Sequence, residues 1–465
     1  MRILPPVVPT PEQLTILADN RRGPVLIRGA AGSGKTTTAL LRLKHLCGSW
    51  TSRLERIGED RAVRVLVLTY NRTLKGYISE LARQQVTARA GLELRVETFG
   101  KWSLSLLEDT AILDRRGAAA LLRPLVRAMP ANPEFLIDEV DYVLGRFEPE
   151  RLADYIPVRR DGRGRSPRVG PGLRGQLLKN VIVPYQAAKE QRGVKDWNDI
   201  ALEASRVDGA EPWDVVIVDE AQDFSANQVR TVLAHLAPDH SVTFVMDAAQ
   251  RIYPRFFTWK EAGVELAKVH PLTRNYRNTR QIAAFARALL EDLPAEDDGT
   301  LPDFDACVKA GSVPIVVSGG YGAQIEFMLD ELERTADFER ESVAFLQPRG
   351  GAWFTHLRDR LSARGIAFRE LTRESSWPTG PEAVALCTIH SAKGLEFDHV
   401  VMPGLNQEVT PHGAEDGDAQ LDALRRLVAM GAGRARTSLM LGFKPSDPST
   451  VLSFLKPATF RRVAL

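Results

Sequence analysis

A glycine-rich stretch near the start of the chain has the residue types and spacing that bind phosphate groups. It runs from Gly29 to Thr36, follows a short apolar run and leads into a helix-like segment. Glycines let the backbone curl so that successive N–H groups point inward at a helix N-terminus, where they meet phosphate oxygens. In such a loop the Lys35 ammonium reaches the β- and γ-phosphates, and the Thr36 hydroxyl holds Mg²⁺. The pattern predicts that the chain binds a nucleoside triphosphate with Mg²⁺. The residues expected to contact it here are Gly29, Ala30, Ala31, Gly32, Ser33, Gly34, Lys35, Thr36 and Thr37.

A pair of acidic residues ends a second apolar run. Four consecutive β-branched residues, 215–218, predict a fully buried strand, and Asp219 and Glu220 follow it directly. Because burying unpaired charges costs several kcal/mol, acids at this place are difficult to explain as structure alone. Beside a phosphate loop, Asp219 is predicted to lie on the Mg²⁺ side and Glu220 to position the attacking water. The next predicted strand, 241–246, precedes Gln250, which is placed to sense a γ-phosphate.

Hydroxyl, aromatic and cationic side chains follow two other predicted strands, 63–68 and 92–96. These segments read Thr69-Tyr70-Asn71-Arg72 and Thr98-Phe99-Gly100-Lys101-Trp102. The carboxyl ends of parallel strands line the ligand crevice of an open α/β sheet. Aromatic rings with basic neighbours at such an edge can stack on the bases of a single strand. Further stacking surface is expected from Tyr253, Phe257 and Trp259. The alternative interpretation is that Tyr70, Phe99 and Trp102 belong to the core.

Gln13 precedes the phosphate loop by about one short helix. Thr10 can cap that helix and Pro11 suits its first position. A Gln amide offers both a donor and an acceptor, which is the pairing that adenine requires. Gln13 is therefore a candidate reader of the base, and the alternative is an ordinary surface residue.

Composition restricts the class of protein. The chain has 465 residues, of which 44% are apolar and 26% charged, as in a soluble globular protein. Its net charge of +2 excludes a global polycation, so any nucleic-acid surface must come from local clustering. The three cysteines lie far apart without metal-ligand spacing, which suits a reducing compartment. Without a signal-peptide core or an apolar run near the ~18 residues of a membrane helix, we expect a cytoplasmic location and no membrane partner.

Strand and helix patterns predict an α/β fold with parallel sheets and an insertion. Residues 1–102 and 205–268 are expected to form the first α/β domain, and 103–204 a mostly helical insertion within it. Residues 269–465 are expected to form a second α/β domain that ends in a short tail. The insertion contains a glycine-interrupted basic loop, 158–168, which either contacts phosphates or is a solvated loop.

The series of motifs resembles that of the UvrD/Rep/PcrA-like superfamily 1 helicases over nearly the whole chain. The matching segments are, in the family's order, Gln13, 29–36, 69–72, 98–99, 219–223, 247–253, 275–277, 388–397 and 434–436. The strings Asp219-Glu220-Ala221-Gln222-Asp223 and Lys393-Gly394-Leu395-Glu396-Phe397 are the most specific of these.

The resemblance implies two RecA-like lobes with ATP between them and single-stranded or partly duplex DNA across their top. Tyr276 is then expected to stack on adenine, Glu396 to bond the ribose, and Arg277 and Arg434 to act as arginine fingers. The implied catalytic residues are Lys35, Asp219, Glu220, Gln250, Arg277 and Arg434. The implied DNA-binding residues are Thr69, Tyr70, Asn71, Thr98, Phe99, Tyr253, Trp259, Thr388 and His390.

Three departures from the family pattern bear on function. Gly431 and Gly433 replace residues of a helix that should hold Arg434, and each glycine costs about 1 kcal/mol there. Gly100 stands where the family often has His. Only about 110 residues separate Arg277 from Thr388, which leaves no room for the accessory 2B insertion of larger family members.

Three functional hypotheses follow. The first is a DNA-stimulated ATPase that moves along single-stranded DNA and unwinds duplexes. The second is an ATPase subunit that regulates a companion nuclease, as in bacterial anti-phage systems, because the sequence shows a bare motor without a nuclease motif. The third is a degenerate motor that binds nucleotide or DNA without turnover.

Overall fold

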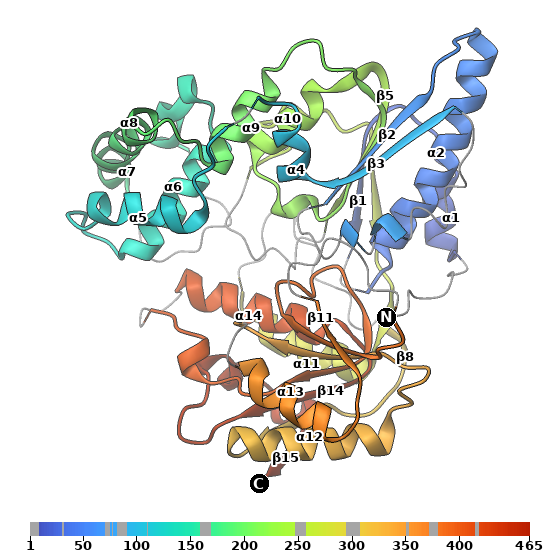
Figure 1. Cartoon of the computed structure of the whole chain (residues 1–465), viewed down its shortest axis with the longest axis vertical. Coiled ribbons are helices and arrows are strands. Elements are labelled where there is room, and N and C mark those ends of the chain that lie inside the picture. Colours follow the sequence, from blue (N-terminus) through green and yellow to red (C-terminus); the bar gives the residue numbers. More distant parts are fainter. Residues whose placement is uncertain are drawn as a thin grey trace.

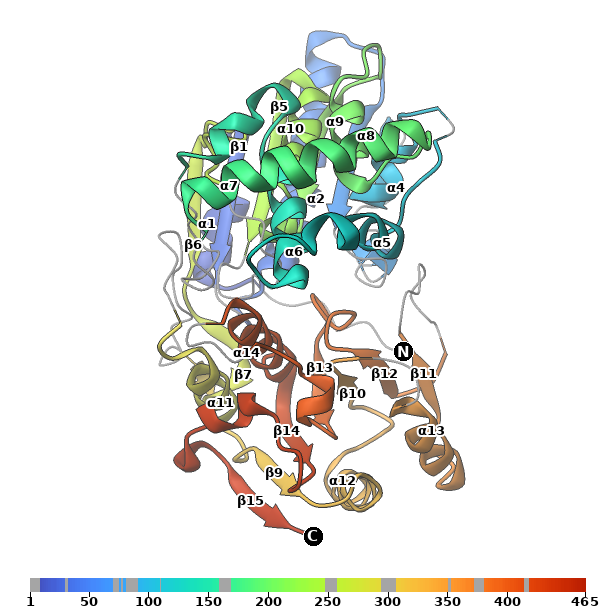
Figure 2. The same ribbon diagram turned by 90° about the vertical axis from the view of Figure 1, so that its left-hand side faces the viewer.

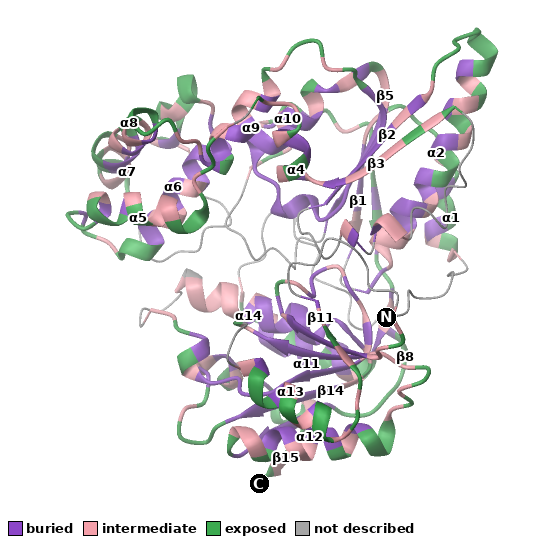
Figure 3. Cartoon of the chain, viewed as in Figure 1, coloured by how far each residue is buried: buried purple, intermediate pink, exposed green. Residues whose placement is uncertain are grey.

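The computed structural model describes residues 9–29, 32–69, 75–76, 78–80, 91–108, 110–158, 169–246, 257–293, 307–349, 353–371, 380–413 and 418–465. Two large sheets, each with helices packed around it, form an upper and a lower lobe in Figure 1, and the turned view in Figure 2 shows the same division. The inner strands of both sheets are largely buried, and the edge strands are more exposed (Figure 3). Every strand pair within the two sheets is parallel. The predicted α/β fold class is confirmed.

The first sheet has the strand order β3-β2-β4-β5-β1-β6. Its strands are β1 Gly23–Gly29, β2 Val63–Thr69, β3 Leu92–Thr98, β4 Trp213–Val218, β5 Leu236–Met246 and β6 Lys268–Leu272. The central strand β4 is buried at all six positions, as its run of apolar residues predicts. Helices flank the sheet, namely α1 Pro11–Leu17, α2 Lys35–Ile57, α4 Phe99–Leu104, α9 Trp197–Ser205 and α10 Ala226–Ala234.

A group of helices between β3 and α9 projects from one side of the first lobe (Figure 1). It contains α5 Arg115–Val126, α6 Pro133–Arg146, α7 Pro171–Leu177 and α8 Val183–Gln191, with a 3-10 turn at Pro149–Tyr155 and a π turn at Leu178–Ile182. These helices bury an apolar cluster of their own. Polar contacts that join the group to the first lobe include Arg146 to Glu261 and the Asn227 side chain to the Leu144 carbonyl at 2.8 Å.

The second sheet has the order β11-β12-β10-β13-β14-β9-β15. Its strands are β9 Ile315–Ser318, β10 Val343–Gln347, β11 Phe368–Glu370, β12 Val384–Thr388, β13 Phe397–Met402, β14 Ala435–Phe443 and β15 Arg461–Ala464. Its helices are α11 Arg280–Leu290, α12 Tyr321–Thr335, α13 Trp353–Ala363 and α14 Ala419–Ala432, with 3-10 turns at Gln407–Val409, Thr450–Phe454 and Pro457–Thr459. A separate pair joins β7 Asn275–Thr279 to β8 Cys307–Lys309.

The end of the chain differs from its prediction as a short tail. Residues Arg461–Ala464 pair with β9 and form an edge strand of the second sheet. Among the helices of the described residues, none combines the length and apolar character that a membrane-spanning segment requires.

Candidate nucleotide-binding site between the two lobes

The glycine-rich loop joins β1 to α2, and its backbone needs glycine at two positions. Gly32 and Gly34 have φ angles of +80° and +76°, which L side chains rarely adopt. Space is a second constraint, because a Cβ atom on Gly32 would lie 2.1 Å from Oδ1 of Asn275. Helix α2 begins at Lys35, with Gly34 as its N-cap. The loop can therefore present backbone N–H groups at a helix N-terminus, where anions bind. Ala30 and Ala31 lie outside the described residues.

The end of β4 brings a carboxylate to the first turn of α2. The Thr36 hydroxyl donates to Asp219 Oδ2 at 3.0 Å. Burial and the neighbouring Glu220 charge raise the pKa of Asp219 to about 7. A hydroxyl and a carboxylate are hard oxygen donors that suit Mg²⁺, which is commonly held by one or two carboxylates together with substrate phosphates. The described residues contain no cluster of three or more His, Cys, Asp or Glu that could hold a metal ion without such a substrate.

Glu220 has an unusual backbone and a cationic environment. It is one of two non-glycine residues among the described ones with positive φ, at 54°. Backbone conformations of this kind are concentrated at functional sites. Gln222 donates a hydrogen bond to its carboxylate. Burial acts to raise the pKa of Glu220, but the charges of Lys393, Arg434 and Lys35 outweigh it and lower that pKa. The side chain is thus held ionised, as a group that accepts a proton from water must be.

A buried ion pair connects the two lobes at the acidic segment 219–223. Lys393 lies between β12 and β13, and its Nζ is 2.6 Å from Asp223 Oδ2 and 3.6 Å from Glu220 Oε2. The Lys393 and Asp223 side chains are 2% and 0% exposed. Both residues belong to motifs that the sequence displays, but no role was predicted for either. Their charges inside two highly specific strings were the available signal.

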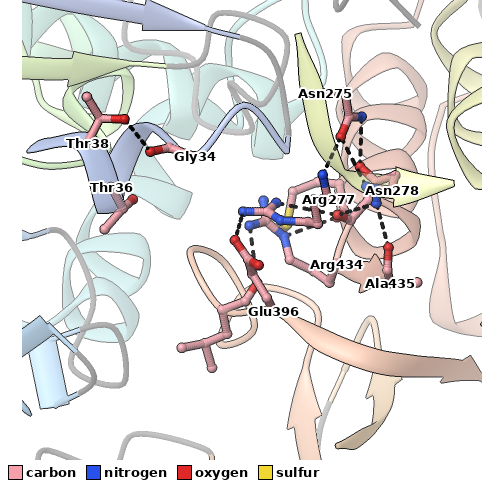
Figure 4. A network of polar contacts seen from close by, with 12 residues as sticks. Gly34, Thr36, Thr38, Asn275, Arg277, Asn278, Glu396, Arg434 and Ala435 are labelled. Carbon is pink, nitrogen blue, oxygen red and sulfur yellow. Dashed lines mark hydrogen bonds and ion pairs between the residues drawn. The ribbon is translucent and has the colours of Figure 1, made fainter. Parts of the chain in front are cut away.

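The two arginines predicted as fingers lie together in the second lobe. Arg434 is 2% exposed, and its Nε donates to the Met430 carbonyl at 3.2 Å. The guanidinium of Arg277 donates to the Glu396 carboxylate (Figure 4). Burial opposes ionisation of Glu396, yet the charges of Arg277, Arg436 and Arg434 lower its pKa. Glu396, which the resemblance implies as a ribose ligand, is here the partner of Arg277.

Gln13 and Tyr276 both lie against the glycine-rich loop. Gln13 is 3% exposed, which excludes the alternative of an ordinary surface residue. Its Oε1 accepts from the Thr10 N–H at 2.9 Å in a capping box, and a Cβ on Gly34 would lie 2.7 Å from its Nε2. The Tyr276 N–H donates to the Gly32 carbonyl at 3.1 Å. The loop is thus contacted by the segments that carry both predicted adenine contacts.

Several predicted DNA contacts are buried. Phe99 is 3% exposed and packs edge-on against Trp102 and Phe224, at centroid distances of 5.8 and 5.7 Å. The core alternative is therefore correct for Phe99 and Trp102, and the prediction that they offer stacking faces is wrong for this arrangement. The reason is that α4 starts directly at the end of β3 and turns both rings inward. Thr69 is also fully buried.

The remaining predicted DNA contacts are more varied. The Thr98 hydroxyl accepts from the Lys101 N–H at 3.3 Å and caps α4. Trp259 is partly buried against Phe244, with centroids 4.9 Å apart. The Thr388 hydroxyl donates to the Ser391 hydroxyl at 2.9 Å, and His390 is exposed. Predicted residues outside the described part of the chain are Tyr70, Asn71, Gln250 and Tyr253.

Comparison with known proteins agrees with this geometry. The model of the UvrD-like helicase C-terminal domain matches residues 369–445, and that of an AAA domain matches 13–255. ATP-dependent DNA helicase UvrD2 of Mycobacterium tuberculosis and of Mycobacterium bovis is 24% identical, over 94% of this chain and 79% of the relative. DNA helicase II of Rickettsia typhi is 40% identical over 24% of this chain and 17% of its own. ATP-dependent DNA helicase PcrA of Bacillus subtilis is 37% identical over 16% of this chain and 10% of its own.

The fold and the site define a nucleoside triphosphatase assembled from two α/β lobes. The chain belongs to the UvrD-like helicases, a family of ATP-hydrolysing DNA helicases.

Proposed function

We propose that the chain is an ATP-dependent DNA helicase in which hydrolysis between the lobes drives movement along single-stranded DNA. The observation that carries the proposal is the convergence of charges from both lobes. Lys393 of the second lobe contacts Asp223 and Glu220 of the first. The positive charge of Arg434 lowers the pKa of Glu220. The adjacent Asp219 accepts a hydrogen bond from Thr36. If groups from both lobes must meet to act on one phosphate, hydrolysis is coupled to the relative movement of the lobes.

Each side chain has a proposed part in hydrolysis. The loop N–H groups and Lys35 bind the triphosphate, and Thr36 with Asp219 would hold Mg²⁺, which neutralises phosphate charge when bound. Glu220 orients the attacking water and accepts its proton, which its lowered pKa allows. Arg277 and Arg434 stabilise the charge that develops on the γ-oxygens. In comparable NTPases an arginine finger contributes about 10³- to 10⁵-fold in rate.

The ion pair between Arg277 and Glu396 sets a condition for the proposed role of Arg277 at the phosphate. In the described arrangement Nη2 of its guanidinium is bound to Glu396, so that nitrogen can bind phosphate only after this contact is released. A ribose hydroxyl that donates to Glu396 offers the carboxylate a replacement partner. Closure on ATP and opening after hydrolysis would then alternate the grip of the two lobes on the DNA strand.

The DNA surface is proposed to use the predicted residues that remain accessible. His390 is exposed, Thr388 and Thr98 are half-buried, and Trp259 is partly buried. Phe99 is left out because its ring is in the core. Single-stranded or partly duplex DNA is the proposed partner.

The test is ATP turnover with and without saturating single-stranded DNA, together with strand separation on a partly duplex substrate. We expect DNA to stimulate turnover and Arg434→Ala to lower kcat by at least about a hundredfold. The matched control is Arg364→Ala, which removes a partly buried arginine paired with Glu326 in the same lobe and should leave kcat unchanged. Turnover that ignores DNA would overturn the motor proposal. A companion nuclease whose activity changes with Lys35→Ala would favour the regulatory-subunit hypothesis instead.

A further inference from the structure

The carboxamide of Asn278 connects β7 to the segment that carries Arg434. Asn278 is 2% exposed, and its Nδ2 donates to the carbonyls of Gly433 at 3.1 Å and Ala435 at 2.5 Å (Figure 4). Its Oδ1 accepts from Asn275 Nδ2 at 3.0 Å. A carbonyl can only accept, so the NH₂ group must face Gly433 and Ala435, and both of its hydrogens are used. The Asn278 carboxamide therefore uses both of its hydrogens in hydrogen bonds to the segment around Arg434 and its oxygen in a hydrogen bond within β7.

The other end of the same network lies on the phosphate loop. Asn275 is 2% exposed, and its Oδ1 accepts from the backbone N–H groups of Arg277 and Asn278 at 3.0 Å each. The same oxygen occupies the space that a side chain on Gly32 would need, and the adjacent Tyr276 N–H donates to the Gly32 carbonyl at 3.1 Å. A continuous set of contacts therefore runs from the loop through Asn275 to Asn278.

The backbone held by Asn278 is the junction between α14 and β14, where the Arg434 N–H donates to the Gly431 carbonyl at 3.1 Å and the Arg434 carbonyl accepts from the Phe397 N–H at 3.0 Å. Gly433 and Ala435 flank Arg434, and Gly431 and Gly433 occupy the end of α14, where a glycine lowers helix stiffness. Contacts of the Arg434 guanidinium include those to the carbonyls of Met430 and Leu395, at 3.2 and 3.4 Å. The two hydrogen bonds from Asn278 to the carbonyls of Gly433 and Ala435 add to these backbone hydrogen bonds and tie the main chain around Arg434 to β7.

We propose that Asn278 is a positioning residue for Arg434. It fixes the backbone on both sides of the arginine and, through Asn275, sets that backbone in register with the phosphate loop of the other lobe. This inference rests on the proposed role of Arg434 at the γ-phosphate. Since displacement of a catalytic group by about 1 Å can cost ~10²-fold in rate, a clamp on its backbone is sufficient to control turnover.

The first test separates positioning from nucleotide binding. Asn278→Ala removes the amide, and the isosteric Asn278→Asp keeps its shape but has no hydrogens to donate. Under saturating single-stranded DNA we expect either change to lower kcat by about ten- to a hundredfold. The dissociation constant of a fluorescent ATP analogue should stay within about twofold of wild type in Asn278→Asp. This variant loses the donors to Gly433 and Ala435 but keeps the Oδ1 atom that lies against Gly32 of the phosphate loop.

The matched control is Asn406→Ala. Asn406 is a buried amide (3% exposed) of the same lobe, and its Oδ1 accepts from the Lys444 N–H at 2.9 Å. Both variants should lose thermal stability, but only the changes at Asn278 should lower kcat. An equal loss of kcat in both, or an unchanged kcat in a folded Asn278 variant, would overturn the inference.

A double-mutant comparison makes the test independent of stability. If Asn278 acts through Arg434, then Asn278→Ala added to Arg434→Ala should change the residual kcat by less than about twofold. A further loss of tenfold or more in the double variant would mean that Asn278 acts by another route, and the inference would be wrong. If instead Arg434→Ala alone leaves kcat intact, the proposed role of Arg434 fails, which is a distinct result.

Discussion

Asp219 and Glu220 are neighbours with opposite pKa shifts. Burial and the Glu220 charge raise the pKa of Asp219 to about 7, whereas Lys393, Arg434 and Lys35 outweigh burial and lower the pKa of Glu220. Titratable pairs whose environments separate their pKa values in this way often divide a task between them. Here the division assigns proton acceptance to Glu220 and leaves Asp219 to meet a cation beside Thr36.

The first prediction tests that division at Glu220. Glu220→Gln keeps the shape of the side chain but removes the proton acceptor, so kcat should fall by about 10²- to 10⁴-fold. Nucleotide affinity should be retained, because the phosphate loop is unchanged. Steady-state turnover and equilibrium binding of an ATP analogue measure the two effects separately. The control is Glu93→Gln, which removes the charge of an exposed β3 carboxylate that pairs with Arg64. Undiminished turnover in Glu220→Gln would exclude Glu220 as the base.

At the scale of elements, the phosphate loop and helix α2 provide a matched pair of glycines. Gly32 and Gly58 have φ angles of +80° and +73°, but a Cβ on Gly58 would meet nothing within 4 Å. Alanine should therefore strain the backbone at both positions, by about 1 to 2 kcal/mol. Only at Gly32 should it also collide with Asn275. We expect Gly32→Ala to weaken nucleotide binding at least tenfold and Gly58→Ala to leave it unchanged, as measured by equilibrium titration. Equal affinities in the two variants would contradict the proposed loop.

A second prediction at this scale concerns two helices of the second lobe. Hydrogen bonds from Arg360 and Arg364 lower the pKa of Glu326 on α12 to about 2. Because this folded-state pKa lies below the ordinary value, the stabilisation is present above pH ~4.5 and is lost as the pH falls toward 2. Glu326→Gln should therefore lower the melting temperature near neutral pH, and the difference from wild type should narrow below pH ~4.5. A difference independent of pH would show that the carboxylate charge does not hold α12 to the end of α13.

The elements were predictable where one local signal determined them. The apolar run at 215–218 predicted β4, and the Gly-rich segment with Lys35 predicted the loop and the start of α2. The rings of Phe99 and Trp102 were misread, because a strand end with aromatic residues looks the same whether α4 turns them inward or outward. The edge strand β15 was missed since only its pairing with β9 distinguishes it from a tail.

Contacts between the lobes are a property of the whole molecule. Lys393 and Asp223 belong to motifs that the sequence displays, yet their pairing depends on how two separately folded sheets meet. No spacing in the chain encodes the distance between residues 223 and 393. The Asn275–Asn278 network is of the same kind, because its two ends contact the phosphate loop and the segment around Arg434.

The buried pair of Lys393 and Asp223 therefore offers a test of how the lobes are held. Both side chains are almost fully buried, and removal of one partner of such a pair typically costs about 3 to 5 kcal/mol, because the other charge is left uncompensated. We expect Lys393→Met to destabilise the protein by this amount and to lower turnover, since Glu220 also loses a neighbouring cation.

Adding Asp223→Asn to Lys393→Met removes the orphaned charge and should restore much of the stability. It should not restore turnover, because the cation beside Glu220 remains absent. Thermal unfolding and ATPase assays on the two single variants and the double variant separate these effects. If the double variant recovered full turnover, Lys393 would be a structural tie between the lobes with no electrostatic part in hydrolysis. If Lys393→Met left the stability unchanged, the lobes would not be held together in solution by this pair.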